Sequence, residues 1–213
     1  HYVMEACAEN GVAFMVLDRP NPNGHYVDGM VLNPDYSSFV GMHPIPVVHG
    51  MTIGEYATMV NSEGWLKNGI RCELEVIKCR NYDHKTPYQL PIKPSPNLPN
   101  NRAIYLYPSL CFFEGTVVNA GRGTNKQFQV YGAPESTIGD FEYTPVSMSG
   151  AKYPKHQDQL CKGFDLSNLS EAQLLGEKQI NLTYLIEFYQ AYPDKANFFN
   201  NFFDKLAGGT DLR

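Results

Sequence analysis

Residues 12–17, with the sequence Val-Ala-Phe-Met-Val-Leu, form a continuous apolar run that limits the possible folds more than any other segment. A short unbroken run of this kind is typical of a strand that is buried on both faces of a parallel sheet. Asn10-Gly11 directly precedes the run and is typical of a helix C-terminus, so residues 2–9 are predicted to be helical. Helix, glycine and buried strand together indicate the closing unit of a doubly wound α/β domain.

One helix and one strand do not make a parallel sheet, so further strands are expected elsewhere. We interpret the chain as the C-terminal portion of a longer protein, and expect residues 2–17 to pack against a missing N-terminal segment of the same protein. Ligands of open parallel sheets bind beyond the carboxyl ends of the strands. Asp18, Arg19 and Asn21 follow that end and are candidate binding residues. A plain turn is the alternative, because Asn21-Pro-Asn-Gly24 is strong turn chemistry.

The remainder of the sequence predicts a second α/β domain. Residues 24–50 are rich in Pro and Gly and are interpreted as a connection, which divides the chain into residues 1–50 and residues 51–213. Strands are predicted at 72–78, 128–132 and 144–148, a helix is predicted at 180–192, and residues 103–113 fit a helix or two short strands. The predicted core of this domain includes Ile186, Tyr189, Phe199 and Phe203.

The stretch from Cys111 to Thr124 carries the strongest candidate chemistry. Glu114 follows an apolar run, and Arg122 lies eight residues later among glycines that allow tight turns. A partly enclosed Glu114 suits acid/base chemistry, and the planar fork of Arg122 suits a carboxylate ligand. We expect Arg122 to turn towards the ligand rather than towards Glu114. The alternative is a structural Glu–Arg pair that fixes a glycine-rich loop.

Two further binding candidates lie beside predicted local structures. Thr52-Ile-Gly-Glu55 is a capping box that predicts a helix start, and His49 lies just before it. His49 there could bind a ligand oxygen or bond to the backbone. The proline-rich residues 94–99 predict a stiff polar loop on which Ser95 and Asn97 are candidates.

Composition excludes several classes of protein. The formal net charge is -5 and there is no basic block, so no nucleic-acid partner is expected. No apolar run approaches the ~20 residues of a transmembrane helix. Five cysteines without Cys-x-x-Cys spacing, and six histidines without ligand spacing, predict neither a metal site nor a bound cofactor.

Four motifs in this order resemble one family over nearly the whole chain. They are Leu17-Asp-Arg-Pro-Asn-Pro-Asn-Gly24, Pro44-Ile-Pro-Val-Val-His-Gly-Met-Thr52, Pro94-Ser-Pro-Asn97, and Phe113-Glu-Gly-Thr116 with Gly121-Arg-Gly-Thr124. The chain resembles the NamZ-type exo-β-N-acetylmuramidases. The resemblance implies a Rossmann-like domain, of which residues 1–50 are the end, followed by a smaller α/β domain. It implies a bacterial, exported enzyme, periplasmic or extracellular, that releases N-acetylmuramic acid from the non-reducing ends of peptidoglycan fragments.

The same resemblance implies which residues line a cleft between the two domains. Glu114, as the catalytic candidate, would line it with Arg122, Thr116 and Asn97 from the second domain, and Asp18, Arg19, Asn21 and His49 would line it from the first domain and the connection. A favoured catalytic glutamate of the family belongs to the half that this sequence lacks. The competing hypotheses are a non-catalytic protein that binds muropeptides or sugars in the same cleft and, from another class, a nucleotide-sugar enzyme.

Overall fold

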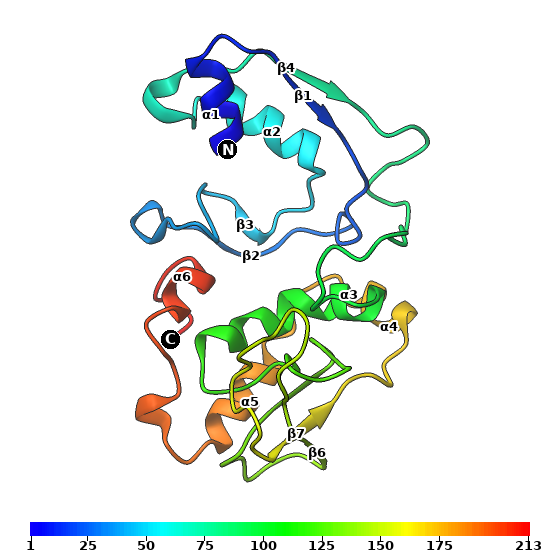
Figure 1. The fold of residues 1–213 in the computed structure, drawn as a ribbon, viewed down its shortest axis with the longest axis vertical. Coiled ribbons are helices and arrows are strands. Elements are labelled where there is room, and N and C mark those ends of the chain that lie inside the picture. Colours follow the sequence, from blue (N-terminus) through cyan, green and yellow to red (C-terminus); the bar gives the residue numbers. More distant parts are fainter. The chain divides into compact units, whose positions relative to one another are not determined.

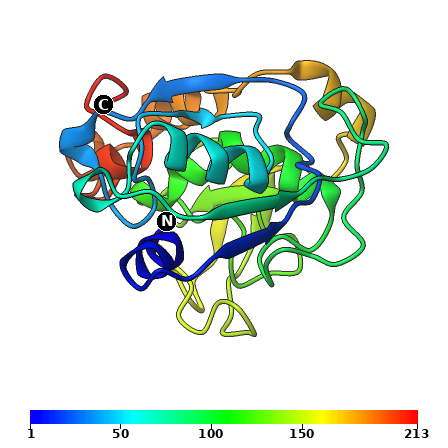
Figure 2. The ribbon, with the colours of Figure 1, turned by 90° about the horizontal axis from the view of Figure 1, so that it is seen from above.

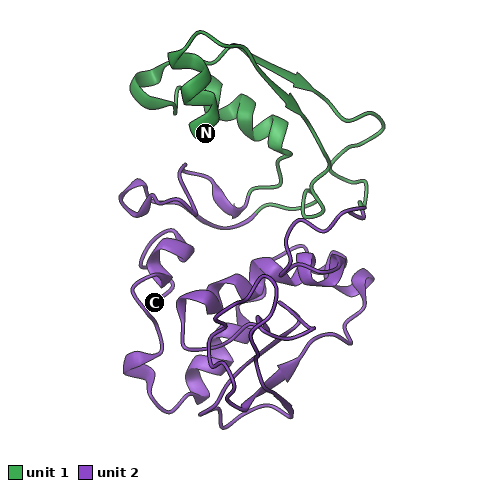
Figure 3. Ribbon diagram, viewed as in Figure 1, with its two compact units in different colours: residues 1–27, 49–88 green, residues 28–48, 89–213 purple.

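The computed structural model describes residues 1–213, which form two compact units (Figure 3). The first unit contains residues 1–27 and 49–88, and the second contains residues 28–48 and 89–213. These units do not coincide with the expected division at residue 50. The reason is that residues 49–88 return to pack with the N-terminal helix and strand, while residues 28–48 pack with the C-terminal part of the chain.

The first unit is a two-stranded parallel sheet with helices on one face (Figure 1 and Figure 2). Strand β1 (Phe14–Leu17) pairs with β4 (Leu74–Ile77), and α1 (Tyr2–Glu9) and α2 (Ile53–Ser62) supply Met4, Ala57 and Val60 to the core against Val16. The short helix η2 (Lys67–Gly69) precedes β4. The strand predicted at 72–78 is therefore present, and it provides β1 with a partner from within this chain.

The opposite face of this sheet differs from the expectation for a strand buried on both faces. Met15 and Leu17 are 53% and 72% exposed, and Ile77 on β4 is 45% exposed. The apolar run of residues 12–17 therefore alternates between a buried and an exposed face within this chain, because both helices cover the Val16 side. The capping box is as predicted: Thr52 Oγ1 accepts from Glu55 N, and Glu55 Oε2 accepts from Thr52 N.

The second unit combines helices with small antiparallel sheets. Strands β5 (Val130–Ala133), β7 (Cys161–Asp165) and β6 (Phe141–Tyr143) form one sheet in that order, and β2 (Asp28–Val31) pairs with β3 (Pro46–Val48) in a second. The helices are α3 (Asn101–Leu110), α4 (Glu171–Glu177), α5 (Thr183–Ala191) and α6 (Phe203–Ala207), with the short helices η1 (Pro34–Tyr36), η3 (Cys111–Gly115) and η4 (Lys195–Asn197). The β2–β3 segment is held by bonds from Ile180 N to Asp28 Oδ2 and from Asn33 N to Gly208 O.

Aromatic side chains fill the core of the second unit. Phe113, Phe188, Phe198 and Phe203 are almost fully buried, and Tyr131 stacks on Phe113 with ring centroids 4.9 Å apart. Of the four predicted core residues, Phe203 is buried, and Tyr189 and Phe199 pack against the core. The prediction for Ile186 is wrong. This side chain is 49% exposed, because α5 turns Leu185 and Phe188 towards the core instead.

Two local predictions for this unit have different outcomes. Residues 101–115 form helix α3 continued by η3, which decides between the helix and the two strands left open by the sequence. The strand predicted at 144–148 is absent, since the segment after β6 bonds through Val146 N to Gly123 O instead of to a sheet. Across the whole chain, no helix combines the length and the apolar character needed to cross a membrane.

Candidate functional site

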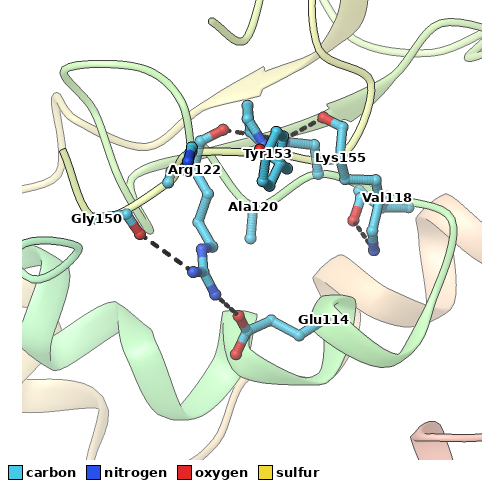
Figure 4. Close-up of a pocket in the computed structure, with 11 residues that line it drawn as sticks. Glu114, Val118, Ala120, Arg122, Gly150, Tyr153 and Lys155 are labelled. Carbon is cyan, nitrogen blue, oxygen red and sulfur yellow. Dashed lines mark hydrogen bonds and ion pairs between the residues drawn. The ribbon is translucent and has the colours of Figure 1, made fainter. Parts of the chain in front are cut away.

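Glu114 and Arg122 form an ion pair on the wall of a pocket of about 410 Å³ in the second unit (Figure 4). Arg122 Nη1 lies 2.7 Å from Glu114 Oε1, and Arg122 Nη2 donates to Gly150 O at 3.3 Å. The Glu114 side chain is 24% exposed and that of Arg122 is 41% exposed. The pocket is lined by Glu114, Val118, Asn119, Ala120, Arg122, Gly150, Ala151, Lys152, Tyr153, Pro154 and Lys155.

The ion pair differs from the expected arrangement, in which Arg122 turned away from Glu114. The carboxylate of Glu114, near the end of η3, and the guanidinium make a short charge-assisted hydrogen bond instead. Arg122 nevertheless remains partly accessible from the pocket, as does Glu114. The structure thus brings together the two residues that the sequence singled out.

The loop that presents Arg122 is built around the buried side chain of Asn119, which is 2% exposed. Its Oδ1 accepts from Gly121 N at 2.6 Å, and its Nδ2 donates to Arg122 O at 3.0 Å and to Lys155 O at 2.8 Å. The Tyr143 hydroxyl donates to the backbone oxygen of Asn119 at 2.9 Å. This one amide therefore fixes the backbone on both sides of Arg122 and ties it to the segment that carries Lys155.

The glycines beside Arg122 are required by backbone conformation and by space. Gly121 and Gly123 have φ values of +78° and +87°, in the left-handed region that favours glycine. A Cβ atom on Gly121 would lie 2.5 Å from Lys126 O, and one on Gly123 would lie 2.7 Å from the ring of Pro154. The tight turn predicted from the sequence is thus present, and Arg122 lies at its centre.

Asn97 and Thr116 contribute to the surroundings of the pocket in different ways. Asn97 Nδ2 donates to Gly150 O at 2.8 Å, so Asn97 and Arg122 share one carbonyl acceptor. Thr116 is 2% exposed; its Oγ1 donates to Phe113 O at 2.9 Å and accepts from Val118 N at 3.0 Å. Neither is a lining residue of the pocket: Asn97 supports one wall, and Thr116 shapes the turn behind Glu114.

The four residues of the segment 152–155 all line this pocket, and none of them is a candidate from the sequence. Tyr153 is 82% exposed, and the ammonium group of Lys152 lies 5.4 Å from its ring centroid. Lys155 Nζ donates to the carbonyl oxygens of Phe113, Thr116 and Val118, and burial lowers the pKa of Lys155 to about 8. The available signal was the sequence Lys-Tyr-Pro-Lys, which gathers two cations and one aromatic ring around a proline.

The candidates of the first unit form their own set of contacts. Asp18 Oδ2 accepts from Thr52 Oγ1 and Asp18 Oδ1 accepts from Gly54 N, both at 2.8 Å, so Asp18 caps the N-terminus of α2. Asn21 Nδ2 donates to Met51 O at 2.9 Å, and its Oδ1 accepts from Asn23 N, which is turn chemistry. Arg19 is exposed.

His49 lies in a different hollow of the first unit, with a volume of about 420 Å³. Its Nδ1 accepts from Met51 N at 3.0 Å, its ring stacks on Tyr56, and burial lowers its pKa. The same hollow contains His84, whose Nε2 lies 3.0 Å from Glu55 Oε1; this hydrogen bond raises the pKa of His84. His49 thus makes the backbone bond that the sequence left open, while its ring still lines a hollow.

Comparison with known proteins gives consistent results over both parts of the chain. Residues 1–102 match the N-terminal domain of the exo-beta-N-acetylmuramidase NamZ, and residues 105–213 match its C-terminal domain. The chain is 38% identical over 229 residues to the peptidoglycan beta-N-acetylmuramidase NamZ of Bacillus subtilis (strain 168). That alignment includes 100% of this chain and 54% of the relative, so the chain spans about half the length of this curated relative.

Two solved structures are similar to the chain. A DUF1343 family protein of Bacteroides fragilis NCTC 9343 has 55% sequence identity and a TM-score of 0.94, with 98% of this chain and 59% of that chain covered. A second DUF1343 family protein of the same organism has 26% identity and a TM-score of 0.70, with 99% and 60% covered. Both matched domains follow one another along this sequence, and the chain belongs to the NamZ family.

Proposed function

We propose that the protein is a glycosidase that acts on peptidoglycan fragments and releases N-acetylmuramic acid from their non-reducing ends. The observation that supports this most is the charge of the pocket in the second unit. Its lining contains one carboxylate, Glu114, and three cations, Arg122, Lys152 and Lys155. A pocket with an excess of positive charge attracts anions. Muramic acid carries a lactyl carboxylate, which the guanidinium of Arg122 can bind through paired hydrogen bonds.

Ligand binding also gives Glu114 a route to acid catalysis. In the structure the carboxylate is bound to Arg122. A ligand carboxylate that takes over Arg122 would release Glu114, whose carboxylate could then take up a proton from solvent and donate it to the glycosidic oxygen. Glycoside hydrolysis usually uses two carboxyl groups, and Glu114 is the one among the residues lining this pocket. We therefore expect the second group outside this lining.

A non-catalytic sugar-binding protein is the second candidate function. The observation that favours it is the Glu114–Arg122 pair itself, because a carboxylate held by a guanidinium can serve binding without any proton transfer. In that case the pocket binds the muramic acid ligand and releases no product. Binding and turnover must therefore be measured on the same preparation.

The test uses the protein expressed from its complete gene. A chromogenic muramic acid glycoside reports release, and the matching N-acetylglucosamine glycoside, which lacks the lactyl carboxylate, tests anion selectivity. A muramic acid–N-acetylglucosamine disaccharide tests the acid, because its leaving sugar needs a proton. Glu114→Gln is expected to lower kcat on the disaccharide by about a hundredfold or more. Glu142→Gln, at an exposed position on β6, is the control and should leave kcat unchanged.

The outcomes separate the two functions. Tight binding of the disaccharide without release supports the binding protein and contradicts the glycosidase. Equal turnover of the two chromogenic glycosides contradicts recognition of the lactyl group. Because the proposed substrate lies outside the cytoplasm, we also propose export; detection of the mature protein in the cytoplasmic fraction alone would contradict it.

A further inference from the structure

Lys155 is a lining residue of the Glu114 pocket whose ammonium group is bound by backbone carbonyl groups. Its Nζ donates to Phe113 O at 3.0 Å, to Val118 O at 2.9 Å and to Thr116 O. A lysine ammonium has three N–H donors, so these three acceptors use all of them. The nearby Val118 and Thr116 are 0% and 2% exposed, which leaves little room for water as a substitute donor.

These carbonyl groups belong to the turn at residues 113–118, from which Glu114 enters the pocket. Phe113 O, in η3, also accepts from Thr116 N at 3.1 Å and from Thr116 Oγ1 at 2.9 Å, whereas the oxygens of Thr116 and Val118 lie in the turn beyond η3. The next residue, His156, adds a bond from Nε2 to Val117 O at 2.6 Å. Lys155 and His156 together thus bind the oxygens of Thr116, Val117 and Val118, from a segment about forty residues away in the sequence.

Charged and titratable side chains of several segments surround the pocket that Lys155 lines. Glu114 favours the charged lysine, and Arg122 disfavours it. Lys152 and His156 share its segment. Burial raises the pKa of Cys111 to about 12 and also raises the pKa values of Tyr107 and Tyr143. Burial lowers the pKa of Lys155 to about 8, so deprotonation of Lys155 is expected in mildly alkaline solution.

We propose that Lys155 is a positioning residue of this site, whose ammonium group gathers three carbonyl oxygens and so fixes the turn that aims Glu114 into the pocket. The inference rests on the proposed function for its catalytic consequence. A neutral amine has two N–H donors and a lone pair for the same three acceptors. Deprotonation therefore removes the positive charge and one N–H donor and turns the nitrogen lone pair towards one of these carbonyl oxygens, which loosens the turn and displaces Glu114.

The experiment combines kinetics with methyl NMR on the protein expressed from its complete gene. Lys155→Met removes the charge, and Lys126→Met removes a lysine that pairs with Asp165 elsewhere in the unit. His156→Gln is the control for the neighbouring imidazole. Turnover of the disaccharide is measured between pH 6 and pH 10 for all variants, and the methyl shifts of Thr116 and Val118 are followed over the same range.

For Lys155→Met we expect kcat to fall at least tenfold with a smaller change in KM, and the alkaline fall of the wild-type profile to disappear. Lys126→Met and His156→Gln should keep that alkaline fall. The methyl groups should show a transition near pH 8 in wild type and in His156→Gln, and none in Lys155→Met. Wild-type kcat together with an unchanged pH profile in Lys155→Met overturns the proposal.

The NMR measurement keeps the proposal testable in two other cases. If Lys155→Met does not fold, absence of the methyl transition in wild type and in His156→Gln overturns the proposal. If wild type does not cleave the disaccharide, the proposed function fails, and the methyl titration alone decides whether Lys155 holds the turn.

Discussion

Replacing Asn119 by alanine tests whether one buried amide holds the whole pocket loop. The substitution removes four side-chain hydrogen bonds, to Gly121 N, Arg122 O, Lys155 O and, at 3.4 Å, the Tyr143 hydroxyl. Each contributes about 1 kcal/mol, and unpaired buried partners add to the loss, so the free energy of unfolding should fall by about 3–4 kcal/mol. That is a large part of the ~5–15 kcal/mol that stabilises a typical domain.

Urea unfolding followed by far-ultraviolet circular dichroism measures this loss. Trp65, the single tryptophan, lies in the first unit, so its fluorescence does not report the loop directly. A loss of this size lowers the urea midpoint by about 1 M or more. Asn125→Ala, at an exposed position of the same loop, should change stability by less than about 0.5 kcal/mol.

Asn119→Asp makes the test sharper, because it keeps the acceptor for Gly121 N and replaces the amide donor by an oxygen. That oxygen would face the carbonyl groups of Arg122 and Lys155, so Asn119→Asp should be at least as destabilising as Asn119→Ala. A loss below about 1 kcal/mol in Asn119→Ala, with turnover intact, would refute the reasoning.

Three further predictions follow from local contacts. The hydrogen bond to Glu55 raises the pKa of His84, so this bond stabilises the first unit fully at a pH below the ordinary pKa of histidine. The stabilisation is lost as the pH rises through the raised pKa. Chemical unfolding monitored by tryptophan fluorescence should show this pH dependence in wild type and not in His84→Gln. Gly123→Ala adds a steric clash with Pro154 to the ~1–2 kcal/mol strain of a left-handed residue. Gly64→Ala adds the strain alone, because Gly64 has a φ of +69° and a Cβ there would have nothing within 4 Å. Calorimetry should therefore give Gly123→Ala the lower melting temperature. Arg122→Ala should raise KM for the muramic acid glycoside more than for the N-acetylglucosamine glycoside, and similar KM changes for both would contradict lactyl recognition.

Local features of the fold were predictable from the sequence because neighbouring residues determine them. The capping box at Thr52, the helix at α5 and the apolar strand β1 all follow from short-range patterns. The pairing of β1 with β4 was not predictable, since alternation at residues 72–78 indicates a half-buried strand without naming its partner. The position of residues 28–48 in the second unit likewise depends on contacts with Ile180 and Gly208.

The candidate site shows the same limit. Glycine spacing predicted the tight turn at Arg122, and Glu114 is near enough in sequence for a direct pair to be foreseen as an alternative. Lys155 reaches the same turn across 37 to 42 residues, and no local pattern encodes that contact. The place of Asp18 after a strand predicts ligand binding, but its carboxylate caps α2 in the structure.

Stability alone does not account for the way the pocket loop is built. An ion pair as accessible as Glu114–Arg122 contributes only about 0–1 kcal/mol. Yet the loop that presents Arg122 needs two left-handed glycines and a buried amide with four hydrogen bonds. A loop constrained so strongly around an accessible, weakly stabilising charge is better explained by recognition of a ligand. Arg122→Met should therefore lose affinity for the anionic sugar while its urea midpoint stays close to wild type, and a large drop in that midpoint would favour a structural role for the pair.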